Sequence, residues 1–290
     1  MKIGLIDVDS HNYPNLALMK LSAWHKAQGD DVEWWNGLKH YDRVYQAKVF
    51  DETYSKDNDF VIQADEVIKG GTGYGLGDSL PDEIEHIYPD YSLYGIKDTA
   101  YGFLTRGCPR LCPFCIVSKK EGTISHKVAD LSEFWRGQRH IEILDPNLLA
   151  CEDRSELLDQ LVKSGGAVNF NQGLDVRLLD QGTAEQLNEV KISMIHFAWD
   201  NFEWHTRDCL ENARKWLNKD ERHVRVYVLV NYNTTIEQDL ARIYTIRAIG
   251  FDPFVMVYDK PSAPKEIRRL QRWCNNKRIF RAEEDFDKYV

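Results

Sequence analysis

Residues 224–258 read VRVYVLVNYNTTIEQDLARIYTIRAIGFDPFVMVY, and this stretch decides the predicted fold. The run at 224–230 predicts a strand, and residues 236–249 show helical periodicity up to Gly250, a residue type that commonly ends helices. A second strand-like run follows at 253–258. Strand, helix and strand in this order indicate two parallel strands joined by a crossover helix.

The same alternation of strand and helix extends back from residue 224 to residue 101. The other strand-like runs of this region lie at 101–105, 140–144, 167–171 and 193–198. Helical periodicity separates them, for instance at 155–163, where leucines recur on one face. Six such units predict an α/β fold in which residues 101–260 form a partial, six-stranded βα barrel. In βα barrels the chemistry gathers at the carboxyl ends of the strands.

The first 80 residues predict a small Rossmann-like α/β domain ahead of the barrel. Its strand-like runs lie at 2–8, 31–35, 44–50 and 60–68, with a helical pattern between Pro14 and Gly29. No helical pattern directly follows the glycines at 70–77, which therefore indicate turns rather than a phosphate-binding loop. Residues 81–100, rich in Gly, Pro, Asp and Tyr, predict a linker, and residues 261–290 a basic C-terminal extension.

Composition restricts the class of protein. The net charge of -9 excludes a chain-wide attraction to nucleic acid or to an anionic membrane, because both bind basic surfaces. The amino terminus lacks a signal-peptide pattern, and there is no run of about 18 apolar residues. We therefore expect a cytoplasmic protein with no membrane partner.

A local excess of positive charge lies near the carboxyl terminus, with one acidic residue, Glu266, among seven basic ones. The basic residues are Lys265, Arg268, Arg269, Arg272, Lys277, Arg278 and Arg281. Such a segment can attract an anionic substrate or RNA. The alternative, which we favour, is a solvated helix face with Ile267, Leu270 and Trp273 turned inward.

Three of the six cysteines lie together in the stretch TRGCPRLCPFCIV, which spans residues 105–117. Three residues separate Cys108 from Cys112 and two separate Cys112 from Cys115, so one tight loop after the first predicted strand presents three thiolates. Four thiolates normally complete a 4Fe-4S cluster. No fourth cysteine lies nearby, so one iron is expected to be left open.

The cysteines have two alternative roles, in structural zinc binding or as neutral thiols. Structural zinc usually requires two short Cys or Cys/His spacings, and a second pair is missing, although His126 is a possible fourth ligand. The remaining cysteines, Cys151, Cys209 and Cys274, are isolated in sequence, and we assign them no role beyond that of neutral thiols. A second, auxiliary cluster is therefore not expected.

The three-then-two spacing, with Phe114 before the last cysteine, resembles the signature of the radical S-adenosylmethionine (SAM) superfamily over residues 101–258. The resemblance implies an open iron that chelates the amino and carboxylate groups of SAM. It also implies that an electron from the cluster cleaves SAM to a 5'-deoxyadenosyl radical, which abstracts hydrogen from the substrate. An electron donor such as flavodoxin or ferredoxin is implied as a partner.

The same resemblance implies SAM-binding side chains near the ends of the other strands. They are Phe114, Asp145, Asn147, Gln172, Arg177, Asp200 and Met256. Phe114 is implied to pack on the adenine, Arg177 to clamp the SAM carboxylate and Asp200 to bind the ribose. The alternatives without SAM binding are structural: a surface salt bridge for Arg177 and a helix N-cap for Asp200. The family's Gly-Gly-Glu segment is absent before Asn147, as is its glycine-containing segment after residue 230.

The N-terminal unit resembles the cobalamin-binding domains that precede some radical SAM barrels. Asp9-Ser10-His11 is similar to the Asp-x-His that presents a cobalt-ligating histidine, but Pro14 stands where a glycine is expected. We therefore expect a degenerate domain without cobalamin.

Together these observations predict a radical SAM enzyme that abstracts hydrogen from an unidentified small-molecule, peptide or nucleoside substrate. One alternative is a methyl or methylthio transferase of the same superfamily, with cobalamin or without it. Another is an iron-sulfur or zinc binding module without SAM chemistry.

Overall fold

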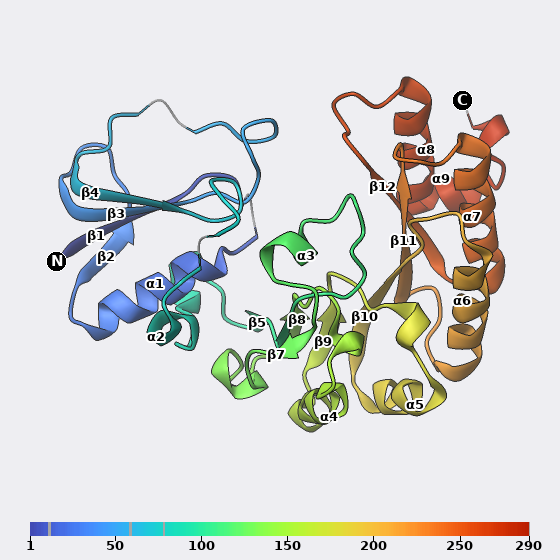
Figure 1. Ribbon diagram of the computed structural model, residues 1–290, viewed down its shortest axis with the longest axis horizontal. Helices are drawn as coiled ribbons and strands as arrows, with labels where there is room; N and C mark the ends of the chain where they lie inside the picture. Colours follow the sequence, from blue (N-terminus) through green and yellow to red (C-terminus); the bar gives the residue numbers. More distant parts are fainter. Residues whose placement is uncertain (11–12, 58–59, 78, 290) are drawn as a thin grey trace.

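The computed structural model describes residues 1–10, 13–57, 60–77 and 79–289, and it contains two parallel β-sheets (Figure 1). The smaller sheet has the strand order β2-β1-β3-β4, and the larger has the order β12-β11-β10-β9-β8-β5. A two-stranded antiparallel ribbon, β6-β7, leaves the larger sheet near its first strand. The predicted α/β class and the six parallel strands of the second unit are confirmed.

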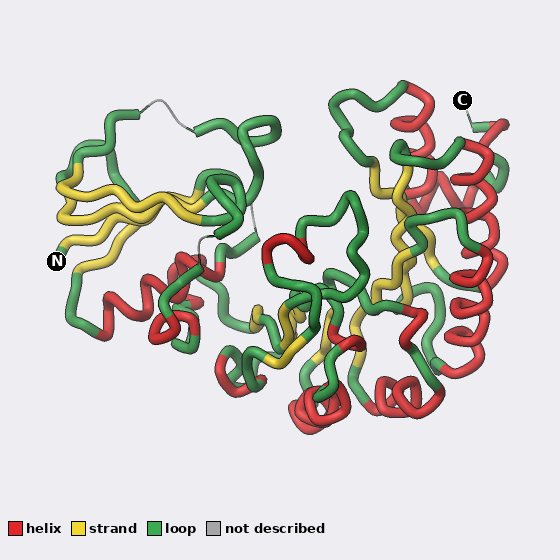
Figure 2. The backbone as a smooth tube through the Cα atoms, in the orientation of Figure 1, coloured by secondary structure: helices red, strands yellow, loops and turns green. Residues whose placement is uncertain are grey.

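The N-terminal unit is one sheet layer with a helix along it (Figure 2). Its elements are β1 (Lys2–Asp7), α1 (Leu16–Ala27), β2 (Asp31–Trp34), β3 (Tyr41–Ala47) and β4 (Ala64–Gly70). Asn15 caps α1, because its side chain accepts a hydrogen bond from the amide of Leu18 at 3.2 Å. Leu18 and Leu21 of α1 pack against Ile3 and Leu5 of β1, which forms the core of this unit.

Residues 81–100 are more ordered than the predicted linker. They form a short helix, α2 (Asp82–Glu85), and a 3-10 turn, η1 (Tyr91–Tyr94). Ile84 belongs to the core of the N-terminal unit, and Tyr91 belongs to the core of the larger unit. The segment therefore packs against both units as well as connecting them.

The larger unit alternates strands with helices or turns. Its elements are β5 (Thr99–Gly102), β6 (Thr105–Arg106), α3 (Val117–Lys120), β7 (His126–Lys127), η2 (Leu131–Glu133), β8 (His140–Ile143), η3 (Leu148–Ala150), α4 (Arg154–Ser164), β9 (Ala167–Phe170), η4 (Val176–Leu178), α5 (Gln181–Glu189), β10 (Ile192–Ala198), α6 (Trp204–Trp216), β11 (Val224–Val230), α7 (Ile236–Ile249), β12 (Asp252–Val257), α8 (Lys265–Asn275), α9 (Lys277–Ala282) and η5 (Phe286–Lys288). Thr235 caps α7 with a capping box, and Gly250 ends that helix in the left-handed conformation.

The six strands of the large sheet follow one another in chain order, which has a consequence for the helices. Crossovers between parallel strands are right-handed, so an unbroken strand order places every connecting helix on the same face. Figure 1 shows α4, α5, α6 and α7 on one side of the strands and α3 on the other. Along β11 the four valines are buried, while Arg225, Tyr227 and Leu229 between them are only partly buried. One face is thus apolar and covered by helices, and the other carries larger and more polar side chains.

Three predicted strands have wrong boundaries. The third strand of the small sheet runs from 41 to 47 and not from 44 to 50, because its ladder with β4 begins at Tyr41 and ends at Ala47. The first strand of the large sheet ends at Gly102 and not at residue 105, because the ladder between β5 and β8 ends there and the chain turns into β6. The last strand of the small sheet runs from 64 to 70 and not from 60 to 68, because its register with β3 begins at Tyr41 opposite Ala64.

The basic C-terminal segment forms the amphipathic helix α8. Ile267, Leu270 and Trp273 are buried, which confirms the predicted inward face. Arg268 donates to the carbonyl of Ala263 at 3.1 Å, and Arg269 donates to that of Phe286 at 2.9 Å. Part of the positive charge therefore holds the C-terminal chain together, which leaves less of it for RNA.

In the ranges that the structure describes, every helix is too short or too polar to span a lipid bilayer.

Candidate functional site

The three clustered cysteines lie on the loop between β6 and α3, beside the carboxyl ends of β5 and β8. The loop is closed at its base: the Cys108 amide donates to the carbonyl of Gly122 at 3.2 Å, and Arg106 pairs with Glu121 at 2.7 Å. Gly107 has a φ of +84°, and a Cβ there would lie 2.1 Å from the carbonyl oxygen of Ile124. Only glycine permits the chain to enter the loop along this path.

Asp145 fastens the start of the loop to the large sheet. It is 3% exposed, and its carboxylate accepts hydrogen bonds from the amides of Leu104 and Thr105, both at 2.8 Å, and from the Thr105 hydroxyl at 2.6 Å. Burial raises the pKa of Asp145 to about 7, although the donors of Thr105 and Leu104 favour its ionised form. Sequence reasoning gave Asp145 to SAM, whereas here its oxygens bind the chain that leads into the cysteine loop.

We expect Asp145→Asn to lower the free energy of unfolding by about 2 kcal/mol, because one carboxylate oxygen becomes an amide NH2 that faces buried donors. Urea unfolding at pH 8, where the native carboxylate is ionised, measures the change. The exposed Asp208 on α6 supplies the control substitution Asp208→Asn. Equal unfolding midpoints for Asp145→Asn and the wild type would contradict the assigned role.

Asn147 contacts the first cysteine directly. Its side-chain NH2 donates to the sulfur of Cys108 at 3.5 Å, and its backbone carbonyl accepts from the Ser125 hydroxyl at 2.9 Å. Asn147 is 2% exposed, and its side-chain oxygen has no hydrogen-bond partner among the residues described. The Asn147 side chain thus donates a hydrogen bond to the Cys108 sulfur, while its oxygen has no partner among the described residues.

Charged side chains surround the second cysteine. The pKa of Cys112 is raised by burial and by the nearby Asp200, and Arg177 acts in the opposite direction. Arg177 itself is held by Asp175, with Nε to Oδ1 at 2.7 Å. Arg110, from within the cysteine loop, pairs with the other oxygen of Asp175. Asp175 therefore ties the loop to the chain that follows β9.

Asp200 lies at the carboxyl end of β10 and is mostly buried. Burial raises its pKa to about 6, and the neighbouring Arg242 and Arg177 act to lower it. The alternative role of Asp200 as a helix N-cap was wrong, because α6 begins at Trp204 and Glu203 stands at its N-cap. The Asp200 carboxyl group is thus free of a capping role.

Phe114 is the first of three aromatic rings in contact, and the other two are tyrosines that follow the last strands of the sheet. Its ring makes an edge contact with that of Tyr232 at 5.4 Å, and Tyr232 makes one with Tyr258 at 4.9 Å. Tyr232 follows β11 and Tyr258 follows β12, so the aromatic chain crosses from the cysteine loop to the far edge of the sheet. Sequence reasoning regarded Asn231 and Tyr232 only as a departure from a glycine pattern.

Gln172 and Met256, the other two residues predicted to contact SAM, make few contacts. Gln172 is exposed, and its side chain makes no hydrogen bond in the described part of the chain. Met256 is 44% exposed on β12, the edge strand of the sheet. The structure therefore brings Asn147, Arg177 and Asp200 close to the cysteines and leaves Gln172 and Met256 without such contacts.

Sequence reasoning missed Arg242, which is fully buried below the ends of β10 and β11. It donates to the carbonyl of Leu229 at 2.8 Å and pairs with Asp239 at 2.5 Å, and it also bonds the carbonyl of Trp199. The available signal was an arginine on the apolar face of the predicted helix, three residues after an aspartate. Its contact with Trp199 holds the backbone next to Asp200.

The three thiols of the cysteine loop are not bonded to one another. All three are free and partly buried. No group of three or more His, Cys, Asp or Glu side chains is arranged around one point in the ranges described, and His126 is not grouped with two of the cysteines. Cysteines that hold an iron-sulfur cluster bind different irons, so their sulfurs need not converge on one point. The donor set, with the Asn147 amide on one sulfur, fits such a cluster.

No protein-family model matches the chain, and no curated protein is significantly similar to it.

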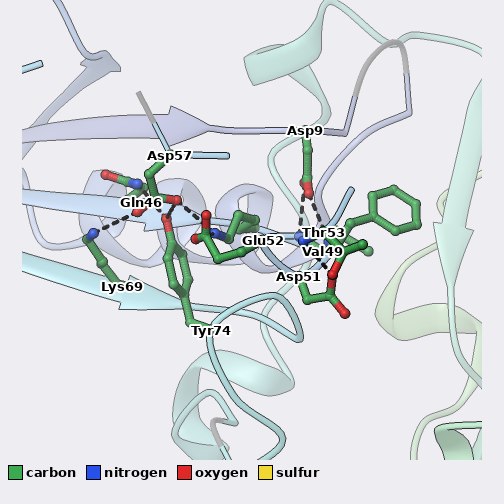
Figure 3. Close-up of polar contacts among 11 residues, drawn as sticks. Asp9, Gln46, Val49, Asp51, Glu52, Thr53, Asp57, Lys69 and Tyr74 are labelled. Carbon is green, nitrogen blue, oxygen red and sulfur yellow. Dashed lines mark hydrogen bonds and ion pairs between the residues drawn. The ribbon is translucent and has the colours of Figure 1, made fainter. Parts of the chain in front are cut away.

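The loops at the carboxyl ends of the small sheet are occupied by their own contacts (Figure 3). The carboxylate of Asp9 accepts from the amides of Val49 at 2.9 Å and Phe50 at 2.8 Å. Gly73 packs so closely that a Cβ would lie 2.3 Å from the carbonyl oxygen of Phe50. His11, which the resemblance matches to a cobalt-ligating histidine, lies outside the described residues. Asp9, which the resemblance pairs with it, is engaged by backbone amides.

Proposed function

We propose that the chain is a radical SAM enzyme built on a partial, six-stranded βα barrel. In this proposal Cys108, Cys112 and Cys115 hold a 4Fe-4S cluster that, when bound, supplies the electron for reductive cleavage of SAM to a 5'-deoxyadenosyl radical. The observation that carries the proposal is the position of three free thiols on one loop at the carboxyl ends of parallel strands. That edge is where βα folds collect their reacting groups.

The residues around Cys112 support a role in binding SAM. Arg177 and Asp200 lie near this cysteine, and they offer a cation for the SAM carboxylate and a hydrogen-bond acceptor for the ribose hydroxyls. Arg177 already binds a carboxylate, that of Asp175, through its Nε and its NH2 group, at 2.7 and 3.3 Å. A guanidinium presented in this way can take a second carboxylate or exchange partners.

Phe114 and Tyr232 offer flat apolar surface for an adenine ring beside the same loop. Asn147 complements them at Cys108, because an N–H donor toward a cluster sulfur tunes the cluster. We propose that Asp145 and Gly107 act only by holding the loop in place.

We further propose that the N-terminal unit works without cobalamin, which disfavours the cobalamin-dependent transferase. The engaged carboxylate of Asp9 supports this proposal, since it is not free to orient a histidine ligand. Absorbance spectra of the protein after incubation with hydroxocobalamin and gel filtration test it. Retained cobalamin that is lost in His11→Ala would refute it.

The proposed activity is tested by anaerobic reconstitution of the full chain with iron and sulfide, followed by addition of dithionite and SAM. We expect 5'-deoxyadenosine to accumulate. A small flavodoxin or ferredoxin is the proposed physiological donor and can replace dithionite in a second arm. A fully loaded cluster that never cleaves SAM would exclude the enzyme and favour an iron-sulfur binding module.

A further inference from the structure

The face of the large sheet opposite to helices α4 to α7 carries a row of hydrogen-bonding side chains. Tyr101, Glu142 and Asn169 lie opposite one another in the register of β5, β8 and β9. His196 of β10 and Tyr227 of β11 lie further along the sheet, with their rings stacked 4.8 Å apart at 10°. We call these five residues the inner patch.

Burial disfavours charge at two residues of the inner patch. Burial raises the pKa of Glu142 above its usual value and lowers that of His196, so both environments favour the uncharged form. The nearest cation along β11, Arg225, is paired with Asp252 at 3.0 Å. A charged ligand buried here would lose its hydration, which costs free energy. The patch is therefore suited to an uncharged ligand.

Asn169 gives the patch an unused acceptor. Its NH2 donates to Glu142 Oε2 at 2.7 Å, while its side-chain oxygen is buried and has no hydrogen-bond partner among the described residues. An unsatisfied buried acceptor costs free energy unless a ligand supplies a donor. Asn169 and the neighbouring Glu142 carboxyl group can together hydrogen-bond a ligand that carries both a donor and an acceptor.

The N-terminal unit closes this face with Tyr13. The Tyr13 ring makes an edge contact with that of Tyr101 at 5.4 Å, and its hydroxyl accepts from the Asn171 side chain at 2.7 Å. The Tyr227 hydroxyl donates to the carbonyl of the same Asn171 at 3.1 Å. Aromatic rings from both units therefore border the hydrogen-bonding pair of Glu142 and Asn169.

We propose that the inner patch, closed by Tyr13, binds the substrate of the radical reaction and that the bound group is an uncharged nucleobase. This inference rests on the proposed function. A nucleobase is planar, has donors and acceptors along one edge and stacks on aromatic rings, which matches the hydrogen-bonding pair of Asn169 and Glu142 and its aromatic border. An isolated amide shares the edge but offers little surface for stacking.

The experiment is calorimetric titration of reconstituted full-length protein with guanosine, cytidine and uridine. SAM is present at saturation and reductant is omitted, so that the SAM site is filled and no turnover occurs. N-acetylglutaminamide is the amide probe. We expect at least one nucleoside to bind and the amide to bind much more weakly.

Asn169→Ala should raise the Kd of that nucleoside about tenfold, because the donor and the acceptor of Asn169 are both lost. Tyr13→Phe keeps the ring and removes only the hydroxyl bonded by Asn171, so we expect a smaller rise, about threefold. The matched controls are Asn212→Ala on the outer helix α6 and Tyr54→Phe, whose hydroxyl lies 3.5 Å from Asp259. Both should bind like the wild type, and circular dichroism checks that each variant is folded.

Three outcomes would overturn the inference: no nucleoside binds while SAM is still cleaved, the amide binds as tightly as the nucleosides, or a folded Asn169→Ala variant binds like the wild type. In each of these cases the proposed function stands, because SAM cleavage with dithionite is measured separately. If SAM is never cleaved by loaded protein, the proposed function fails and this inference fails with it.

Discussion

Cys112→Ser should reduce both the iron content of reconstituted protein and the formation of 5'-deoxyadenosine to background. Cys112 is the middle thiol of the loop, and its loss leaves two thiolates for a cluster that normally takes four. Loss of a partner that only hydrogen-bonds a metal ligand costs about 10–100-fold in affinity or activity, so loss of a ligand should exceed about 100-fold. Iron and sulfide analysis, the visible absorbance of the cluster and chromatography of the nucleoside product measure the effect.

The matched control for this prediction is Cys209→Ser. Cys209 is a free, partly buried thiol on α6 whose sulfur lies 3.6 Å from the His205 ring, and it is not one of the three clustered cysteines. We expect it to load iron and cleave SAM like the wild type. If Cys112→Ser retained a full cluster, or if Cys209→Ser lost as much iron, the assignment of the loop as the cluster site would be wrong.

Gly107→Ala should displace the cysteine loop and strongly reduce iron loading without touching a thiol. The positive φ of this residue costs an alanine about 1–2 kcal/mol, and the new Cβ would also lie 2.1 Å from the Ile124 carbonyl oxygen. A backbone atom cannot move aside as a flexible side chain can. The loop between Arg106 and Cys108 must therefore shift, and the first cysteine shifts with it. Iron content after reconstitution and the midpoint of urea unfolding measure the two consequences.

Gly122→Ala is the control that separates the cost of the positive φ from the cost of the close approach at Ile124. Gly122 closes the same loop and has a similar φ of +92°, but nothing lies within 4 Å of a Cβ placed there. It should show the cost of the positive φ alone and keep most of its iron. If the two variants loaded iron equally, the close approach at Ile124 would not matter to the site.

The six-stranded sheet could be predicted because its signal is local. Each strand of the larger unit is a short apolar run beside a helical pattern, as at 224–258, and consecutive units of this kind pair in order. The position of the cysteine loop followed from the same reasoning, since the loop comes directly after the first predicted strand. The boundary at Gly102 did not follow, because it depends on Asp145, a residue distant in sequence that captures the amides of Leu104 and Thr105.

The partners of the charged site residues could not be predicted either. Asp175 binds Arg110 as well as Arg177, and Arg242 lies below Trp199, only because strand ends from different units meet at one edge. No spacing rule links residues that are 65 positions apart, as Arg110 and Asp175 are. The same is true of Tyr13 and Asn171, which are 158 positions apart and meet across two units.

The α/β class, the six strand and helix units of the larger domain and the presence of three thiols on one short loop follow from the sequence alone, because periodicity and spacing are properties of neighbouring residues. Only the tertiary structure decided which side chains surround those thiols: Asn147 at Cys108, Arg177 and Asp200 near Cys112, and Tyr232 at Phe114. It also decided that Glu142 and Asn169 pair on one face of the large sheet and that Tyr13 of the N-terminal unit contacts Tyr101 there. The physical reason is that hydrogen bonds and burial depend on distance in space, which the packing of the two units sets.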